Sequence, residues 1–186
     1  VRLCHAMLAT GFYAAPAVLV LLRSALREPL MNYADDSVEL RLLKMIEMLL
    51  RVEYVQTQAL LSPEVNEYLS VVRSLRYYDR AIRRDTALSY QLAFFLRKHG
   101  FPAKRVMVGP YALKVCDPVE RINFEPLEHR TFRSRLDILP TDRKLNHLKE
   151  IGWRSFEVKA SDWHAMDSYE AKAAYVRSIL KENELQ

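Results

Sequence analysis

The stretch Thr141–Trp163, TDRKLNHLKEIGWRSFEVKASDW, changes its hydrophobic period once and so predicts a helix followed by a strand. Thr141 is expected to cap the helix, and apolar residues recur at helical spacing up to Ile151. Gly152 then suits the left-handed conformation that ends many helices. Residues 153–160 alternate aromatic or β-branched with polar side chains, which is typical of a strand. This helix–strand unit predicts an α/β fold for the region around it.

The residues before this unit predict further strands. Segments 104–108 and 112–116 are short, rich in valine and separated by Gly109-Pro110, a pattern that indicates a β-hairpin or two adjacent strands. A helix that starts at Asp85 leads into them, and we expect it to end at Gly100.

Residues 117–140 hold three prolines and nine charged residues without a sustained period, so we expect a long loop with room for short strands. A last helix is expected to start near Ser168. The second half of the chain should therefore run α-β-β-α-β-α.

The first half of the chain reads as consecutive amphipathic helices. Two are expected over residues 2–8 and 16–27. Asp36 is expected to cap a third helix, whose apolar residues recur at spacings of three and four. Ser62-Pro63 signals a fourth start, with a hydroxyl cap and a proline in the first turn.

Composition agrees with a packed, mainly helical protein. Half of the 186 residues are hydrophobic and only four are glycine. The net charge of +5 is spread over both halves, so local clusters must carry any argument for a polyanionic partner. Cys4 and Cys116 have no disulfide or metal spacing and are expected to be buried, reduced thiols of an intracellular or organellar protein.

The apolar run Phe12–Leu22 is about half of the ~20 residues that cross a bilayer, so no membrane-spanning helix is expected. The first residue is Val1, which led us to expect a fragment of a longer protein.

Several motifs resemble the RAP domain, an RNA-binding module that is abundant in apicomplexans and closes the FAST-kinase-like mitochondrial proteins. Members share a threonine three residues before a lysine, a Gly-Trp or Gly-Tyr after the helix, a hydrophobic strand, and an acidic residue beside a tryptophan. The matching residues here are Thr141-Asp142-Arg143-Lys144, Leu148, Gly152-Trp153, Asp162-Trp163 and Tyr175.

The resemblance covers residues 109–180 and extends to Asp85 if the preceding helix is included. It implies a small restriction-endonuclease-like α/β domain, which a helical region usually precedes. We therefore expect an α+β, mainly helical protein with a helical array over residues 1–84 and a RAP-like domain over residues 85–186.

In related nucleases a core strand carries carboxylates that hold a divalent metal, and RAP domains usually read Glu-Val-Asp-Gly-Pro-Ser-His there. We match this motif to residues 114–120, where Lys114, Cys116 and Glu120 stand in place of the glutamate, aspartate and histidine. Hard cations need oxygen ligands, and Asp117 is one residue out of register, on the opposite strand face. We expect no metal, no cofactor and no catalysis.

Clusters of basic residues are the candidates for RNA contact. Residues 73–84 carry arginines at helical spacing beside Tyr77 and Tyr78, a pattern suited to a phosphate backbone with stacked bases. The plainer interpretation of this cluster is a solvated face with ion pairs to Asp79 and Asp85, and that of the basic loop from Arg130 to Arg135 is surface decoration. Trp153 and Trp163 are expected to be packing residues. The expected RNA contacts are Arg73, Arg76, Arg80, Arg83, Arg84, Lys104, Arg105, Lys114, Arg130, Arg133, Arg135 and Lys144.

These patterns predict a non-catalytic RNA-binding protein of the mitochondrion, most concretely a ribosomal component or scaffold on ribosomal RNA with protein neighbours and no membrane. One alternative is a metal-dependent RNA endonuclease or processing factor that uses Asp117, Glu120 and Lys144. Another is a protein-interaction module in a large assembly, which exposed apolar residues within Phe12–Leu22 would favour.

Overall fold

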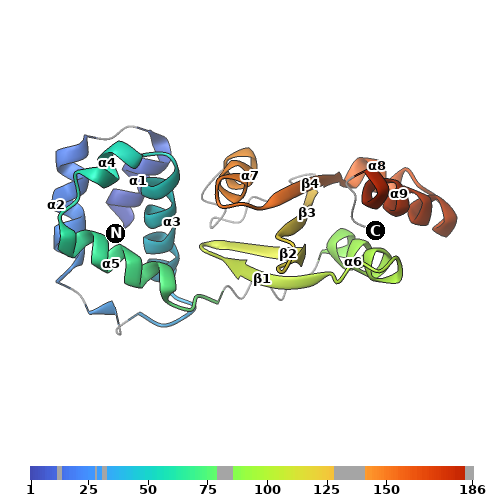
Figure 1. Cartoon of the computed structure of the whole chain (residues 1–186), viewed down its shortest axis with the longest axis horizontal. Coiled ribbons are helices and arrows are strands. Elements are labelled where there is room, and N and C mark those ends of the chain that lie inside the picture. Colours follow the sequence, from blue (N-terminus) through green and yellow to red (C-terminus); the bar gives the residue numbers. More distant parts are fainter. Residues whose placement is uncertain (12–13, 28, 31–32, 79–85, 128–140, 183–186) are drawn as a thin grey trace. The chain divides into compact units, whose positions relative to one another are not determined.

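The structure, a computed structural model, describes residues 1–11, 14–27, 29–30, 33–78, 86–127 and 141–182. Its contacts divide the chain into two compact units, Val1–Arg80 with Met107–Tyr111, and Ala81–Val106 with Ala112–Gln186. Figure 1 colours the elements along the chain. Helices predominate over a single four-stranded sheet in the described residues, which confirms the expected mainly helical α+β class.

The first unit contains consecutive helices, as the amphipathic pattern predicted. Tyr54, the residue before a short helix, links it to the first helix by donating its Oη hydrogen to the Leu8 carbonyl at 2.8 Å. A short helix after Tyr54 was not predicted. The helices are α1 (Arg2–Thr10), α2 (Ala15–Ala25), α3 (Val38–Val52), α4 (Val55–Ala59) and α5 (Pro63–Ser74).

Helix α3 is the buried centre of the first unit. Every residue from Leu42 to Leu50 is buried. The expected cap at Asp36 was wrong, because Ser37 occupies the N-cap and its Oγ accepts a hydrogen bond from the Leu40 amide at 3.1 Å. At α5, Ser62 is the N-cap residue as predicted, but its hydroxyl donates to Glu64 instead of accepting from the helix.

The second unit combines the sheet with helices. Its strands have the order β1-β2-β3-β4, with β2 and β3 antiparallel and β3 and β4 parallel. The predicted hairpin strands and the strand after Gly152 are confirmed. The elements are α6 (Ala87–Lys98), β1 (Lys104–Val108), β2 (Tyr111–Asp117), β3 (Ile122–Leu127), α7 (Thr141–Glu150), β4 (Arg154–Lys159), α8 (Ala160–His164) and α9 (Tyr169–Glu182).

Strand β3 lies in the stretch where we expected a long loop with room for short strands, and its six residues pair along the whole of β4. Its pairing with β2 involves Ile122 and Asn123, at the opposite end from Pro126. The proline ring therefore lies where the missing N–H is not needed for that ladder. Residues 128–140 lie outside the described part of the chain.

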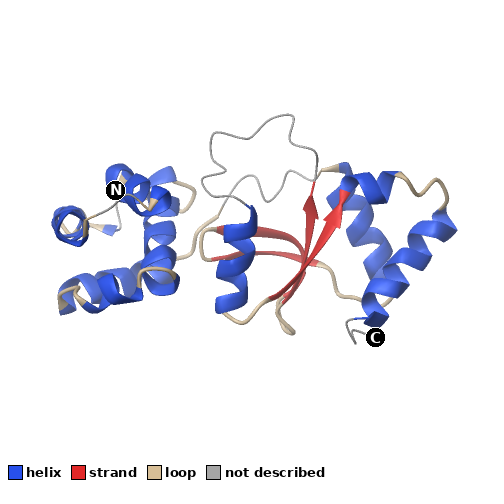
Figure 2. Ribbon diagram, turned by 90° about the horizontal axis from the view of Figure 1, so that it is seen from above, coloured by secondary structure: helices blue, strands red, loops and turns tan. Residues whose placement is uncertain are grey.

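Alternation along β3 places an apolar and a polar layer on opposite sides of the sheet. Ile122 and Phe124 enter the apolar core of the second unit, together with residues of α6, α8 and α9. Asn123 and Glu125 therefore point to the other face. Figure 2 shows α7 on one side of β3 and β4, with α8 and α9 on the other.

Helix ends in the second unit follow the predicted glycines. Gly100 (φ 87°) and Gly152 (φ 86°) both adopt the left-handed conformation after α6 and α7. Trp153 N–H then reaches the Leu148 carbonyl at 2.9 Å, a bond typical of this helix ending. One start differs from expectation, because Thr86 caps α6 through a reciprocal bond with Ser89. Helix α7 begins at Thr141, the residue expected at its start.

The two tryptophans are packing residues, as predicted. Trp153 and Trp163 are both buried, and Trp163 Nε1 donates to Gln91 Oε1 at 2.8 Å. Cys4 and Cys116 are free and buried, also as predicted. Within the described residues, no helix has both the length and the apolar content to span a bilayer.

Candidate nucleic-acid interface

The polar face of the sheet is organised around one ion pair. Lys144 Nζ of α7 lies 2.7 Å from both carboxylate oxygens of Glu125, and each side chain is 16% exposed. Asn123, buried on the same face, donates its Nδ2 to Glu125 Oε2 at 3.3 Å. The pair follows directly from the alternation of β3, which turns Glu125 away from the core and towards α7.

The buried Cys116 thiol lies on this face of β2, opposite Asn123 of β3. Burial, with a smaller contribution from the neighbouring Asp117 carboxylate, raises the pKa of Cys116 to about 12. The charges of Lys104 and Lys144 act in the opposite direction and lower the pKa, so both lysines lie within electrostatic range of the sulfur. The thiol donates to the Lys104 carbonyl at 3.5 Å. Two predicted RNA contacts, one on β1 and one on α7, therefore lie within electrostatic range of the same residue of β2.

The other predicted contacts of this unit lie on the same hairpin. Lys114 is half-buried on β2, two residues from Cys116 and hence on the same strand face. Lys104 and Arg105 are exposed neighbours on β1 and point to opposite faces. We name Lys104, Lys114 and Lys144 the lysine cluster.

The structure also bears on where carboxylates lie in this unit. We matched the metal-binding motif of the family to residues 114–120 on β2. The carboxylate that lies beside Lys144 belongs to Glu125 on β3, outside the matched motif on β2. Asp117 is buried at the end of β2, and its Oδ1 accepts a hydrogen bond from the Val119 amide at 2.9 Å. In the described part of the chain, no three His, Cys, Asp or Glu side chains gather as metal ligands.

The expected helix does not run from Arg73 to Arg76, and residues 79–84 of the expected arginine face lie outside the described residues. Helix α5 ends at Ser74, and Leu75 has extended backbone angles (φ −57°, ψ 138°). Tyr77 is buried, and the Tyr78 amide donates to the Asp35 carbonyl at 2.8 Å. Burial of Tyr77 thus takes the chain out of the helix before Arg76, so helical spacing does not place Arg73 and Arg76 on a shared face.

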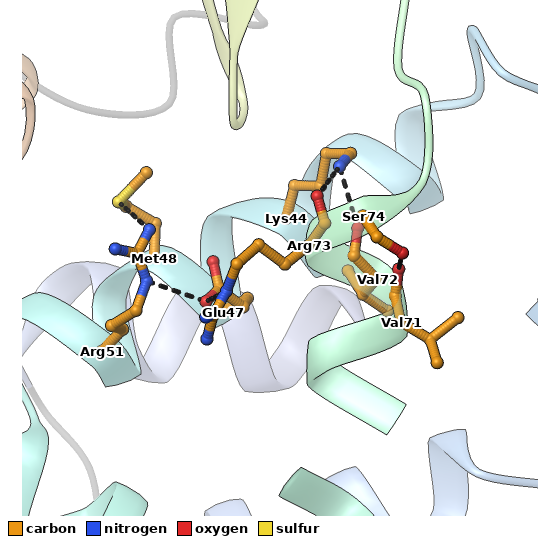
Figure 3. A network of polar contacts seen from close by, with 8 residues as sticks. All are labelled: Lys44, Glu47, Met48, Arg51, Val71, Val72, Arg73 and Ser74. Atoms are coloured by element: carbon orange, nitrogen blue, oxygen red, sulfur yellow. Dashed lines mark hydrogen bonds and ion pairs between the residues drawn. The ribbon is translucent and has the colours of Figure 1, made fainter. Parts of the chain in front are cut away.

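Arg73 is half-exposed and belongs to a polar network around the buried Glu47 (Figure 3). Its Nε lies 2.6 Å from Glu47 Oε1, which also accepts from Arg51 Nε at 2.9 Å. Glu47 is only 3% exposed, so two arginines neutralise a carboxylate that the fold has taken out of water. Arg73 therefore has a structural partner, and Arg76 is exposed.

Lys44 completes this network without contacting an acid directly. Its Nζ donates to the Val72 and Arg73 carbonyls at 2.8 and 3.1 Å, where α5 ends. Burial lowers the pKa of Lys44, while the charge of Glu47 acts in the opposite direction. A buried lysine thus satisfies carbonyls that the end of a helix leaves without intrahelical donors.

Half of the predicted RNA contacts are not described by the structure. These are Arg80, Arg83, Arg84, Arg130, Arg133 and Arg135, which lie in the stretches 79–85 and 128–140.

Sequence reasoning missed Glu125 and a group of exposed aromatic residues on α6. Glu125 follows Ile122-Asn123-Phe124, whose alternation was the available signal for a strand. The aromatic signal was Tyr90 and Phe94, which are four residues apart and hence on one helix face.

Comparison with known proteins leaves the family open. No protein-family model matches this chain, and no curated protein matches it. The RAP resemblance rests on the motifs between Thr141 and Tyr175 and stays a prediction.

Proposed function

We propose that this chain is a non-catalytic RNA-binding protein that works within a ribonucleoprotein assembly, in its most concrete form the mitochondrial ribosome. The observation that carries the proposal is the lysine cluster, whose members come from β1, β2 and α7, with Lys104 and Lys144 within electrostatic range of Cys116. The mitochondrion follows from the RAP resemblance alone.

The physical basis is the attraction between fixed positive charges and phosphate. Lysine acts towards phosphate as a point charge and needs no exact geometry. Contacts of this kind fix a protein on a nucleic acid without reading its sequence, which suits a scaffold on structured RNA. Arg105 extends the positive charge of β1 to the other face of the strand.

The local roles of the acidic residues support a non-catalytic protein. The Asp117 carboxylate holds the turn at Val119, and the Glu125 carboxylate is neutralised by Lys144. Both carboxylates therefore have partners that stabilise the folded chain.

Filter binding of the full chain to a structured RNA at low salt tests this function. We expect binding that weakens when Lys104 and Arg105 are both changed to glutamine. Arg177→Gln on α9 removes another exposed charge and should leave binding nearly unchanged. Absence of binding by the wild-type chain, or equal losses in the two variants, would contradict the proposal.

An endonuclease is the second candidate, and the Glu125–Lys144 pair is the observation that favours it. A carboxylate beside a lysine is a starting point for metal-assisted phosphodiester hydrolysis. Incubating the chain with RNA and Mg²⁺ or Mn²⁺ separates the two functions. Cleavage that disappears in Glu125→Gln or Asp117→Ala would establish the enzyme and overturn our preference.

A protein-interaction module is the third candidate. Leu3 on α1 and Val20 on α2 are each 62% exposed, and Val20 belongs to the apolar run that would favour such a role. Loss of assembly on Val20→Ser, with RNA binding retained, would support it.

A further inference from the structure

Helix α6 carries exposed aromatic side chains beside a lysine. Tyr90 is 65% exposed and Phe94 is 43% exposed, and with Lys98 they recur every four residues along one face. Tyr169, the first residue of α9, is 47% exposed. We name Tyr90, Phe94, Lys98 and Tyr169 the aromatic patch.

The underlying core holds two of these rings in place. Phe94 packs edge-on against the buried Phe95, with centroids 5.6 Å apart, and Tyr169 lies against the same ring at 4.9 Å. Phe95 in turn contacts Trp163, which is fully buried. Because Phe95 already holds the rings of Phe94 and Tyr169 in place, these side chains lose little conformational entropy when a ligand binds to their exposed faces.

A positive charge accompanies the rings. Lys98 Nζ lies 4.9 Å from the Phe94 centroid and 5.5 Å from the Tyr169 centroid. Helix α6 contains two basic residues, Arg97 and Lys98, and no acidic one. The exposed rings can stack on flat aromatic groups, and the neighbouring lysine attracts negative charge. A ligand that combines flat aromatic groups with negative charge would therefore complement this surface.

We infer that the aromatic patch binds unpaired RNA bases by stacking, with Lys98 contacting the adjacent phosphate. This inference rests on the proposed RNA-binding function and adds a second contact surface of different chemistry. Every base has a flat face, so the surface should accept single-stranded segments with little sequence preference. The lysine cluster would hold phosphates, and the patch would distinguish unpaired strands from duplexes.

Fluorescence anisotropy with a labelled oligouridylate tests the inference. A length of about 12 nucleotides suits a surface of this kind. Phe94→Leu and Tyr90→Leu keep an apolar side chain but remove the ring, and each should weaken binding roughly tenfold, the order expected for one stacked base. Val119→Ala changes an exposed apolar residue elsewhere in the unit and should have no effect. Circular dichroism verifies that each variant is folded.

An oligonucleotide of equal length with abasic interior positions provides the second arm. Its phosphates remain while its stacking faces are gone, so the ring variants should bind it as well as the wild-type chain does. Equal losses on both probes, or none on oligouridylate, would overturn the inference alone. No binding of either probe by the wild-type chain at low salt would overturn the proposed function as well. If ring removal instead abolished self-association in sedimentation, the patch would be a protein contact.

Discussion

Lys144 on α7 donates to both carboxylate oxygens of Glu125 on β3 at 2.7 Å, on the sheet face opposite the apolar core. The pair joins a helix to a strand 19 residues earlier in the chain. The ion pair gives Lys144 a partner within the fold, whereas Lys104 is exposed to solvent.

The first prediction concerns the cost of breaking this pair. Lys144→Met should lower the free energy of unfolding by about 1–3 kcal/mol, because a mostly buried carboxylate loses its partner. Glu125→Gln should also destabilise, and the double variant should show a coupling of about 0.5–3 kcal/mol. Urea denaturation of the four proteins measures it. Strictly additive losses would mean that the two groups do not interact.

The second prediction concerns Lys44. Lys44→Met removes the donor to the Val72 and Arg73 carbonyls and should destabilise the protein by about 1–3 kcal/mol. Glu39→Gln is the control in the same helix, since its ion pair with Arg2 is exposed and worth about 1 kcal/mol or less. Thermal unfolding followed by circular dichroism compares them. A Lys44 variant as stable as the control would contradict the capping role.

The third prediction concerns the pH dependence of Cys116. Its pKa rises from an ordinary 9.0 to about 12, so the folded state holds the thiol proton more tightly than the unfolded state. This contribution to stability is intact below pH 9 and is lost as the pH rises towards 12. The stability advantage of wild type over Cys116→Ala should therefore shrink between pH 8 and pH 11, measured by urea denaturation. An advantage that grows with pH would refute the assignment.

The fourth prediction concerns thiol reactivity. Burial raises the pKa of both cysteines, Cys4 to about 11 and Cys116 to about 12, so neither forms the reactive thiolate readily near neutral pH. Iodoacetamide should leave both unmodified in the native chain at pH 8 and alkylate both in guanidinium chloride. Mass spectrometry counts the modified residues. Rapid alkylation of the native chain would show that the thiols are accessible.

The sequence predicted elements whose signal is local. Helix α7, Gly152 and β4 follow from apolar spacing and a glycine within 20 residues, and the hairpin follows from two valine-rich segments around Gly109-Pro110. The bounds of β3 could not be predicted within residues 117–140, where we allowed for short strands, because prolines and charges dominate the stretch and conceal a six-residue alternation.

The site needed information that is not local. The Glu125–Lys144 pair depends on the alternation of β3 and on the placement of α7, which separate segments determine. The expected helix does not reach Arg76, because burial of Tyr77 and the contacts of Lys44 end α5 at Ser74, although the arginine spacing alone continues. Tertiary contacts can override helical spacing in this way.

The salt dependence of RNA affinity tests the central claim most directly. If the exposed charges of β1 contact phosphates, the logarithm of affinity should fall linearly with the logarithm of salt concentration. Changing Lys104 and Arg105 to glutamine should reduce that slope by roughly two, about one for each lost contact. Arg177→Gln should leave the slope unchanged. An affinity that does not vary with salt, or a slope that the double variant leaves intact, would contradict this account.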